Sequence, residues 1–138
     1  LARARGAVVT GVGSPANQDY PRSIGICPLV YGEDLASELT KSADRFDAVL
    51  DCAGRGALGT VLPAIGQEAR IASITDQGAG ITTVFARSNP TALADLSQMA
   101  SADILKVAVA GTYPLENGPD AQRALMRPRT AGKIVLTL

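Results

Sequence analysis

The sequence predicts an α/β domain built around a mostly parallel β-sheet. Short runs of Val, Ile, Leu and Ala alternate with segments of helical periodicity along its 138 residues. Strands and helices that alternate at this spacing are typical of parallel sheets with crossover helices. The chain is 46% hydrophobic but only 4% aromatic, which favours an aliphatic core between a sheet and helices on both of its faces. Its length is that of one domain, so we expect residues 1–138 to form a single one.

The charge and cysteine content exclude several classes of protein. The 13 basic residues balance 13 acidic ones, so no net charge attracts nucleic acid or a membrane surface. No apolar run approaches the roughly 20 residues of a membrane span. Cys27 and Cys52 lie far apart, which indicates two buried, reduced thiols in a cytoplasmic protein. Histidine is absent, which excludes His-based triads and most zinc sites, and we predict no metal site.

Apolar runs bounded by glycine, proline or polar residues are expected to be the strands. Most are rich in β-branched residues or leucine and are short enough to be buried strands. The predicted strands are Gly6–Thr10, Ile26–Tyr31, Phe46–Cys52, Arg70–Thr75, Ile81–Arg87, Leu105–Ala110 and Lys133–Leu138.

The first two helices are expected between the first three strands. Ser14 followed by Pro15 is a helix start, in which the hydroxyl caps the helix and proline takes its first position. Pro21 should interrupt this helix early. In the second helix, expected over residues 33–42, Leu35 and Leu39 lie four residues apart and should share a buried face.

Three further helices follow. One begins after Gly56 and should end at Pro63 and Gly66. Another opens at Asn89-Pro90, and its apolar stripe is expected to face the core. That stripe is Leu93, Leu96 and Met99. A last short helix, which carries Ala121, Ala124 and Leu125, should stop at Pro128.

A glycine-rich motif follows the strand that ends at Asp51. Residues 54–59 match GxGxxG, and Asp76 lies about 20 residues further on. In a dinucleotide site, such glycines admit a pyrophosphate to a helix N-terminus and the acid binds the ribose. Only about seven residues separate Gly56 from Pro63, however, which is short for the crossover helix. The same strand, acid and glycine turn also resembles the loop that holds S-adenosylmethionine in methyltransferases, and this alternative stays open.

Six segments, taken in order, resemble a known family over nearly the whole chain. They are LARARGAVVTG, SPANQDYPRSIG, FDAVLDCAG, RIASI, YPLEN and GKIVLTL. Their order and gaps resemble the carboxyl-terminal part of the medium-chain dehydrogenase/reductase family, and most closely its zinc-independent NADPH:quinone oxidoreductase branch. The resemblance implies a Rossmann-like, doubly wound nucleotide-binding domain from a longer two-domain reductase. It also implies an incomplete sheet, without the first strand and the glycine-rich phosphate loop.

The resemblance also implies which residues meet the cofactor. Thr10, Gly11 and Ser14 match positions beside the adenosine ribose. Thr10 and Ser14 supply hydroxyls there, and no acidic residue is present. This favours binding of the 2′-phosphate of NADPH over a bare ribose diol. The full set of cofactor-binding residues is Thr10, Gly11, Ser14, Asn17, Arg22, Tyr31, Asp51, Ala53, Gly54 and Ile74. No residue of the chain is identified as catalytic.

Two hypotheses of function remain. The first is the NADPH-binding part of an oxidoreductase that transfers hydride to a quinone or an activated alkene, an enzyme only within the complete protein. The second is a non-catalytic interaction fragment, which would bind no cofactor. In the related reductases dimers form at the edge that corresponds to Ile81–Arg87, so we expect a homodimer through this segment. The place of the missing first strand would then be filled by another copy or segment.

Overall fold

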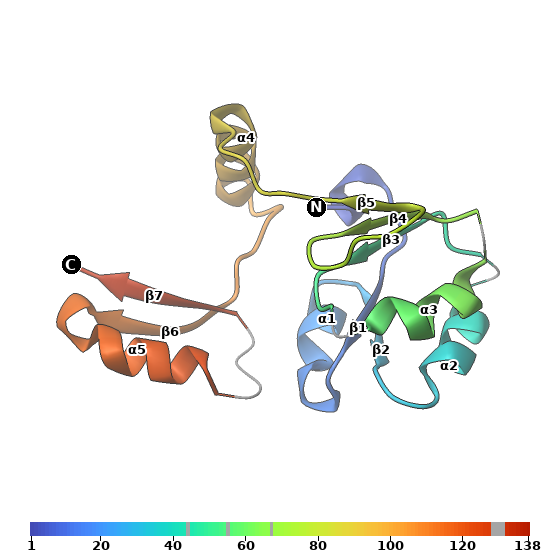
Figure 1. The fold of residues 1–138 in the computed structure, drawn as a ribbon. Helices are drawn as coiled ribbons and strands as arrows, with labels where there is room; N and C mark the ends of the chain where they lie inside the picture. The colour runs from blue at the N-terminus through green and yellow to red at the C-terminus, as the bar shows by residue number, and fades with distance from the viewer. Residues whose placement is uncertain (44, 55, 67, 128–131) are drawn as a thin grey trace. The chain divides into compact units, whose positions relative to one another are not determined.

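The computed structural model describes residues 1–43, 45–54, 56–66, 68–127 and 132–138. The chain divides into two compact units, shown as a ribbon in Figure 1. One unit contains residues 1–27 and 89–138, and the other contains residues 28–88. The α/β class with parallel strands is as predicted from the sequence.

Residues 28–88 are built on a three-stranded parallel sheet. Its strands, in spatial order, are β3 (Ala48–Asp51), β4 (Arg70–Ser73) and β5 (Ile81–Thr83). Val49 lies opposite Ile71, and Asp51 lies opposite Ser73. The carboxyl ends of all three strands therefore lie at one edge, where ligands bind in open sheets of this kind.

Two helices cover one face of this sheet. They are α2 (Leu35–Ser42) and α3 (Ala57–Ile65), which lie side by side against the strands (Figure 1). Leu35, Leu39 and Ile65 are buried between them, and Phe46 and Val49 pack against this cluster. This confirms the prediction that Leu35 and Leu39 share a buried face. Leu29 of β2 (Cys27–Val30) also packs against the cluster.

The N-terminal segment is a series of short elements. They are η1 (Arg3–Arg5), β1 (Thr10–Gly13), η2 (Pro15–Asn17) and α1 (Asp19–Ser23). The predicted strand over Gly6–Thr10 is wrong, because Gly6 adopts a φ of 85° that closes η1, and the Ala7 N–H bonds back to the Ala2 carbonyl. Pairing starts only at Val9, whose carbonyl accepts from the Cys27 N–H.

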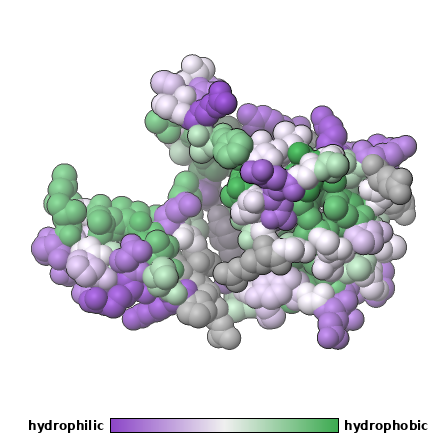
Figure 2. All heavy atoms as spheres, viewed as in Figure 1, coloured by the Kyte–Doolittle hydropathy of each residue, from purple (hydrophilic) through white to green (hydrophobic). Residues whose placement is uncertain are grey.

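The C-terminal segment contains a complete βαβ unit. Its elements are β6 (Val109–Pro114), η3 (Leu115–Asn117), α5 (Gly118–Leu125) and β7 (Lys133–Thr137). The two strands are parallel, and α5 packs on both of them, with Ala121 and Ala124 buried. Figure 2 shows hydrophilic side chains along α5 and hydrophobic ones over the strands.

Two helix predictions differ from the structure, and a third falls on residues that it does not describe. Helix α3 continues through Pro63 and ends at Gly66, whose φ of 83° stops it. The first helical region breaks at Gln18 instead of Pro21, because proline is tolerated in the first turn of α1, where its missing N–H has no partner to lose. The predicted stop at Pro128 lies outside the described residues.

Helix α4 (Pro90–Ser101) starts as predicted, since the Asn89 side chain caps the Ala92 N–H at 3.0 Å. The helix lies wholly within the described range 68–127, and none of its residues is buried. Leu93 is 65% exposed, so the prediction that it faces a core is wrong. Helical periodicity shows which face can be buried, but burial needs an element that packs on that face.

The strand predicted over Leu105–Ala110 begins later. The N–H groups of Ile104 and Leu105 bond back to the Met99 carbonyl and extend the end of α4. The ladder of β6 starts at Val109, because its partner strand begins opposite it at Lys133.

The two cysteines also differ from expectation. Cys27 and Cys52 are free thiols, and both are exposed, so the prediction of burial is wrong. Within the part of the chain that the structure describes, no helix has the length and apolar character needed to cross a bilayer.

Candidate functional site

The carboxylate of Asp51 is the centre of a hydrogen-bond network at the carboxyl edge of the three-stranded sheet. Its Oδ1 accepts from the N–H groups of Ala53 and Gly54, each at 3.0 Å. Its Oδ2 accepts from the hydroxyls of Ser73 and Thr75, each at 2.9 Å. Both carboxylate oxygens are therefore engaged within the chain, and the loop after β3 is tied to the end of β4.

Asp51 is only 6% exposed, yet it remains ionised. Burial raises the pKa of the carboxyl, because the charged form loses hydration. The hydrogen bonds from the Ala53 and Gly54 backbone and from the Ser73 and Thr75 hydroxyls outweigh burial, and they hold the pKa of Asp51 below its ordinary value. A carboxylate that accepts four hydrogen bonds is a poor general base, so its chemistry is structural.

Ser73 extends the network into the following loop. Its side chain is fully buried, and its Oγ accepts from the N–H groups of Thr75 at 3.0 Å and Asp76 at 2.8 Å. A backbone hydrogen bond also joins the ends of β3 and β4, since the Ile74 N–H donates to the Asp51 carbonyl at 3.1 Å. One hydroxyl thus joins the end of β3 to the turn after β4.

Sequence reasoning missed Ser73 and Thr75. It treated Arg70–Thr75 as an apolar strand and looked for function in its last aliphatic residue, Ile74. A signal was available: both hydroxyls lie at the carboxyl end of a strand adjacent to the one that ends in Asp51, and hydroxyls placed there can satisfy a buried acid.

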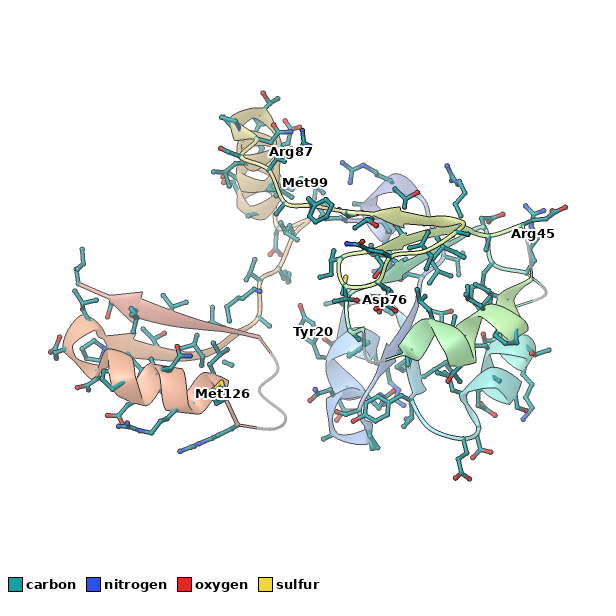
Figure 3. The ribbon with its side chains drawn as sticks, viewed as in Figure 1. Tyr20, Arg45, Asp76, Arg87, Met99 and Met126 are labelled. Atoms are coloured by element: carbon teal, nitrogen blue, oxygen red, sulfur yellow. The ribbon has the colours of Figure 1, made fainter. Side chains whose placement is uncertain are left out.

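The network brings together three of the predicted site residues, Asp51, Ala53 and Gly54. Ile74 lies beside them at the end of β4, with its side chain 52% exposed. Figure 3 shows Asp76 at this edge of the sheet and Arg45 at the opposite end. Tyr31 follows β2 and is 59% exposed.

The other five predicted site residues lie in the N-terminal segment. Thr10 and Gly11 begin β1, Ser14 precedes η2, Asn17 ends it, and Arg22 belongs to α1. The Arg22 guanidinium pairs with Asp19 at 3.1 Å on the exposed surface, so it already has an acidic partner.

The hydroxyl of Ser14 does not cap the helix, contrary to the sequence prediction. Its Oγ is buried, and among the residues that the structure describes it has no hydrogen-bond partner. A buried hydroxyl without a partner costs about 1–3 kcal/mol. The Ser14 carbonyl, by contrast, accepts from the Gln18 side chain at 2.7 Å and from the Asn17 N–H at 3.0 Å.

A cavity of about 490 Å³ lies at the other end of the three-stranded sheet. Its lining includes Arg45, Phe46 and Asp47 before β3 and Glu68 and Arg70 around the start of β4. These are the amino ends of the strands, opposite the edge at which open α/β sheets bind ligands. The cavity is therefore not the candidate site.

The described residues do not offer a zinc site. They contain no group of three His, Cys, Asp or Glu side chains close enough to hold a metal ion. The sequence supplies no histidine, and its two cysteines are separate free thiols, Cys27 and Cys52. Zinc in proteins takes mostly Cys and His ligands, usually four in a structural site and three in a catalytic one.

Parallel strands, crossover helices and a glycine turn at the carboxyl edge define a Rossmann-like nucleotide-binding fragment with small, incomplete sheets. Residues 30–136 match the family described as zinc-binding dehydrogenase. This match covers most of the chain, and the chain belongs to that family. Among curated proteins, none matches the sequence.

Solved structures show the same fold. An NAD-dependent alcohol dehydrogenase matches with a TM-score of 0.84 and 22% identity, over 99% of this chain and 46% of its own. A putative alcohol dehydrogenase from Sinorhizobium meliloti 1021 has a TM-score of 0.84 and 24% identity, over 99% and 43%. The JamJ enoyl reductase, in its apo form, has a TM-score of 0.78 and 21% identity, over 99% and 49%.

The chain thus spans less than half the length of these structures. They confirm the predicted Rossmann-like α/β fold, and the family match supports the broad resemblance to medium-chain dehydrogenases and reductases. The zinc-independent quinone oxidoreductase branch is a finer statement that they leave open.

Proposed function

We propose that this chain is the NADPH-binding part of a zinc-independent oxidoreductase that reduces a small quinone or an activated alkene. The observation that carries the proposal is the buried, unpartnered hydroxyl of Ser14, just beyond the end of β1. The segment from Thr10 to Ser14 contains no acid, whereas a site for the bare ribose diol of NADH would use one.

The chain's own residues would bind and orient the cofactor. Thr10, Gly11 and Ser14 would hold the adenosine ribose and its 2′-phosphate, with Asn17 and Arg22 on the following helices. Tyr31, Ala53, Gly54 and Ile74 would line the rest of its path. The cofactor, when bound, supplies the hydride, and the protein supplies binding, orientation and exclusion of water.

Two observations support the zinc-independent branch and its substrates. The described part of the chain has no cluster of metal-binding side chains, although the family is described as zinc-binding. Two structural neighbours are described as enoyl reductases, and an enoyl group is an activated alkene. The cytoplasm is the proposed location, since both thiols are free.

Titration with the two cofactors tests the proposal. NADPH and NADH are added to the protein, and nucleotide fluorescence gives each Kd. We expect NADPH to bind at least about tenfold more tightly, because a phosphate gains charge-assisted hydrogen bonds that a ribose hydroxyl lacks. Ser14→Ala should weaken NADPH binding and leave NADH binding nearly unchanged. Ser97→Ala, on the exposed helix α4, is the control.

Each result separates the alternatives. Tighter binding of NADH would contradict the NADPH proposal and favour a ribose-binding acid, for which Asp76 is the candidate. No binding of either nucleotide would favour the non-catalytic fragment. The methyltransferase alternative is not favoured, because both carboxylate oxygens of Asp51 are already engaged by the chain.

We also propose a homodimer through Ile81–Arg87. In the structure β5 (Ile81–Thr83) is the outer strand of the sheet formed by described residues, so one of its sides can pair with a second copy. Phe85, in the same segment, is 71% exposed. An aromatic side chain on an edge segment is a common contact between subunits.

A further inference from the structure

The network around Asp51 joins two loops that both lie at the carboxyl edge of the sheet. The loop after β3 contributes the N–H groups of Ala53 and Gly54, and the turn after β4 contributes the hydroxyl of Thr75. All of these groups converge on one carboxylate that is 6% exposed. The Asp51 carboxylate therefore links the positions of the two loops.

The fit between the loops is close. Gly54 has a φ of 63°, and a Cβ on it would lie 2.9 Å from Thr75 Oγ1 and 3.0 Å from Thr75 Cβ. The Thr75 hydroxyl is thus held between the Gly54 backbone and the Asp51 carboxylate. A shift of the turn after β4 would move the glycine turn as well.

We propose that Asp51 is a positioning residue, whose carboxylate sets the Ala53–Gly54 turn against the turn after β4 to shape the edge of the sheet that receives the cofactor. The proposal rests on the proposed function, because it assigns these turns to the cofactor's path. Asp51 itself does not contact the cofactor, since its oxygens face inward to the donors of the chain. The proposal differs here from the resemblance, which implies that Asp51 binds the cofactor.

Thr75 offers the sharpest test, because its hydroxyl can be removed with little change of shape. Thr75→Val loses the hydrogen bond to Asp51, whereas Thr75→Ser keeps a hydroxyl at the same place. Thr91→Val, at an exposed position of α4, is a matched control. Two quantities are measured: the Kd for NADPH by fluorescence, and the amide hydrogen exchange rates of Ala53 and Gly54 by NMR without cofactor.

We expect Thr75→Val to raise both the NADPH Kd and the two exchange rates by about tenfold, the size of effect that a hydrogen bond to a charged group can produce. Thr75→Ser and Thr91→Val should stay within about twofold of the parent. Circular dichroism confirms that each variant is folded. Asp51→Asn should act in the same direction as Thr75→Val, and if it does not fold, the threonine variants still decide the question.

The proposal is overturned if folded Thr75→Val binds NADPH as tightly as the parent, or if Ala53 and Gly54 exchange at the parental rates. Such a result leaves the proposed function intact, because the parent still binds NADPH. A parent chain that binds no NADPH contradicts the proposed function, and the positioning role in cofactor binding then falls with it.

Discussion

Gly54 and Thr75 approach each other so closely that a Cβ on Gly54 would lie 2.9 Å from Thr75 Oγ1. The Gly54 backbone also has a φ of 63°, a left-handed conformation that side chains disfavour. Two independent restrictions, one of space and one of backbone angle, therefore select glycine at this position. The GxGxxG spacing drew attention to the same residue for another reason, as a contact for pyrophosphate.

Gly54→Ala should destabilise the protein by about 1–3 kcal/mol, because the new methyl group forces strain in the backbone or displaces Thr75. Urea unfolding measures the change. Gly59→Ala is the matched control: Gly59 lies inside α3 with no atom within 4 Å of an added Cβ. Alanine there should raise the free energy of unfolding by about 0.5–1 kcal/mol. Equal effects of the two substitutions would contradict the close packing described here.

Ser73→Ala should cost about 1–3 kcal/mol, since it leaves the N–H groups of Thr75 and Asp76 without their buried acceptor and removes a donor to Asp51. Thermal or urea unfolding measures the loss. Ser97→Ala, at an exposed position of α4, should change stability by less than about 0.5 kcal/mol. A Ser73→Ala protein as stable as the parent would show that the hydroxyl is not essential to the network.

The Asp51 network should also make stability depend on acid pH. The folded pKa of Asp51 lies below the unfolded value, which is about 3.9. The network therefore stabilises the folded state above about pH 4, and this contribution is lost as the pH falls through the folded pKa. Asp51→Asn lacks the titrating group, so its stability deficit relative to the parent should be largest near neutral pH and shrink in acid. Urea unfolding of both proteins across the acid range checks this, and a deficit that does not change with pH would contradict it.

The proposed dimer can be tested at the outer side of β5. The Val84 N–H donates to the Ser73 carbonyl at 2.8 Å, so it pairs within the chain's own sheet. Because backbone groups alternate in direction along a strand, the Thr83 N–H points away from β4. Thr83→Pro should thus split a dimer while preserving the pairing of β5 with β4, whereas Val84→Pro should damage the fold itself. Sedimentation measures the mass, and a parent protein that is already monomeric would contradict the dimer.

Much of the fold in residues 28–88 could be predicted from local pattern. Leu35 and Leu39 recur at helical spacing, and the run ending in Asp51 is bounded by a charged residue and glycines, so both elements were recognisable. Each of these elements packs against a near neighbour in sequence. Their environment is therefore encoded within a short stretch of chain.

The remaining errors share a physical cause. The first residue of β6 is set by its partner strand. The apolar run over Leu105–Ala110 therefore predicted a strand that begins too early. The exposure of Leu93 depends on whether another element packs against α4. The periodicity of the helix's own sequence does not contain that information. The network of Asp51, Ser73 and Thr75 joins groups that are 22 and 24 residues apart, and no local pattern records such a pairing.

The parallel strand pairs have a consequence for how the chain folds. The contact between Asp51 of β3 and Ser73 of β4 spans 22 residues, and that between Tyr113 of β6 and Thr137 of β7 spans 24. Parallel pairing is slow when it must close long loops, because the entropy is lost before any contact is gained. Here each pair closes a loop of similar, modest length around a single helix. These contacts are thus closed within short stretches of chain, whereas the unit that contains residues 1–27 and 89–138 also joins segments from the two ends of the sequence.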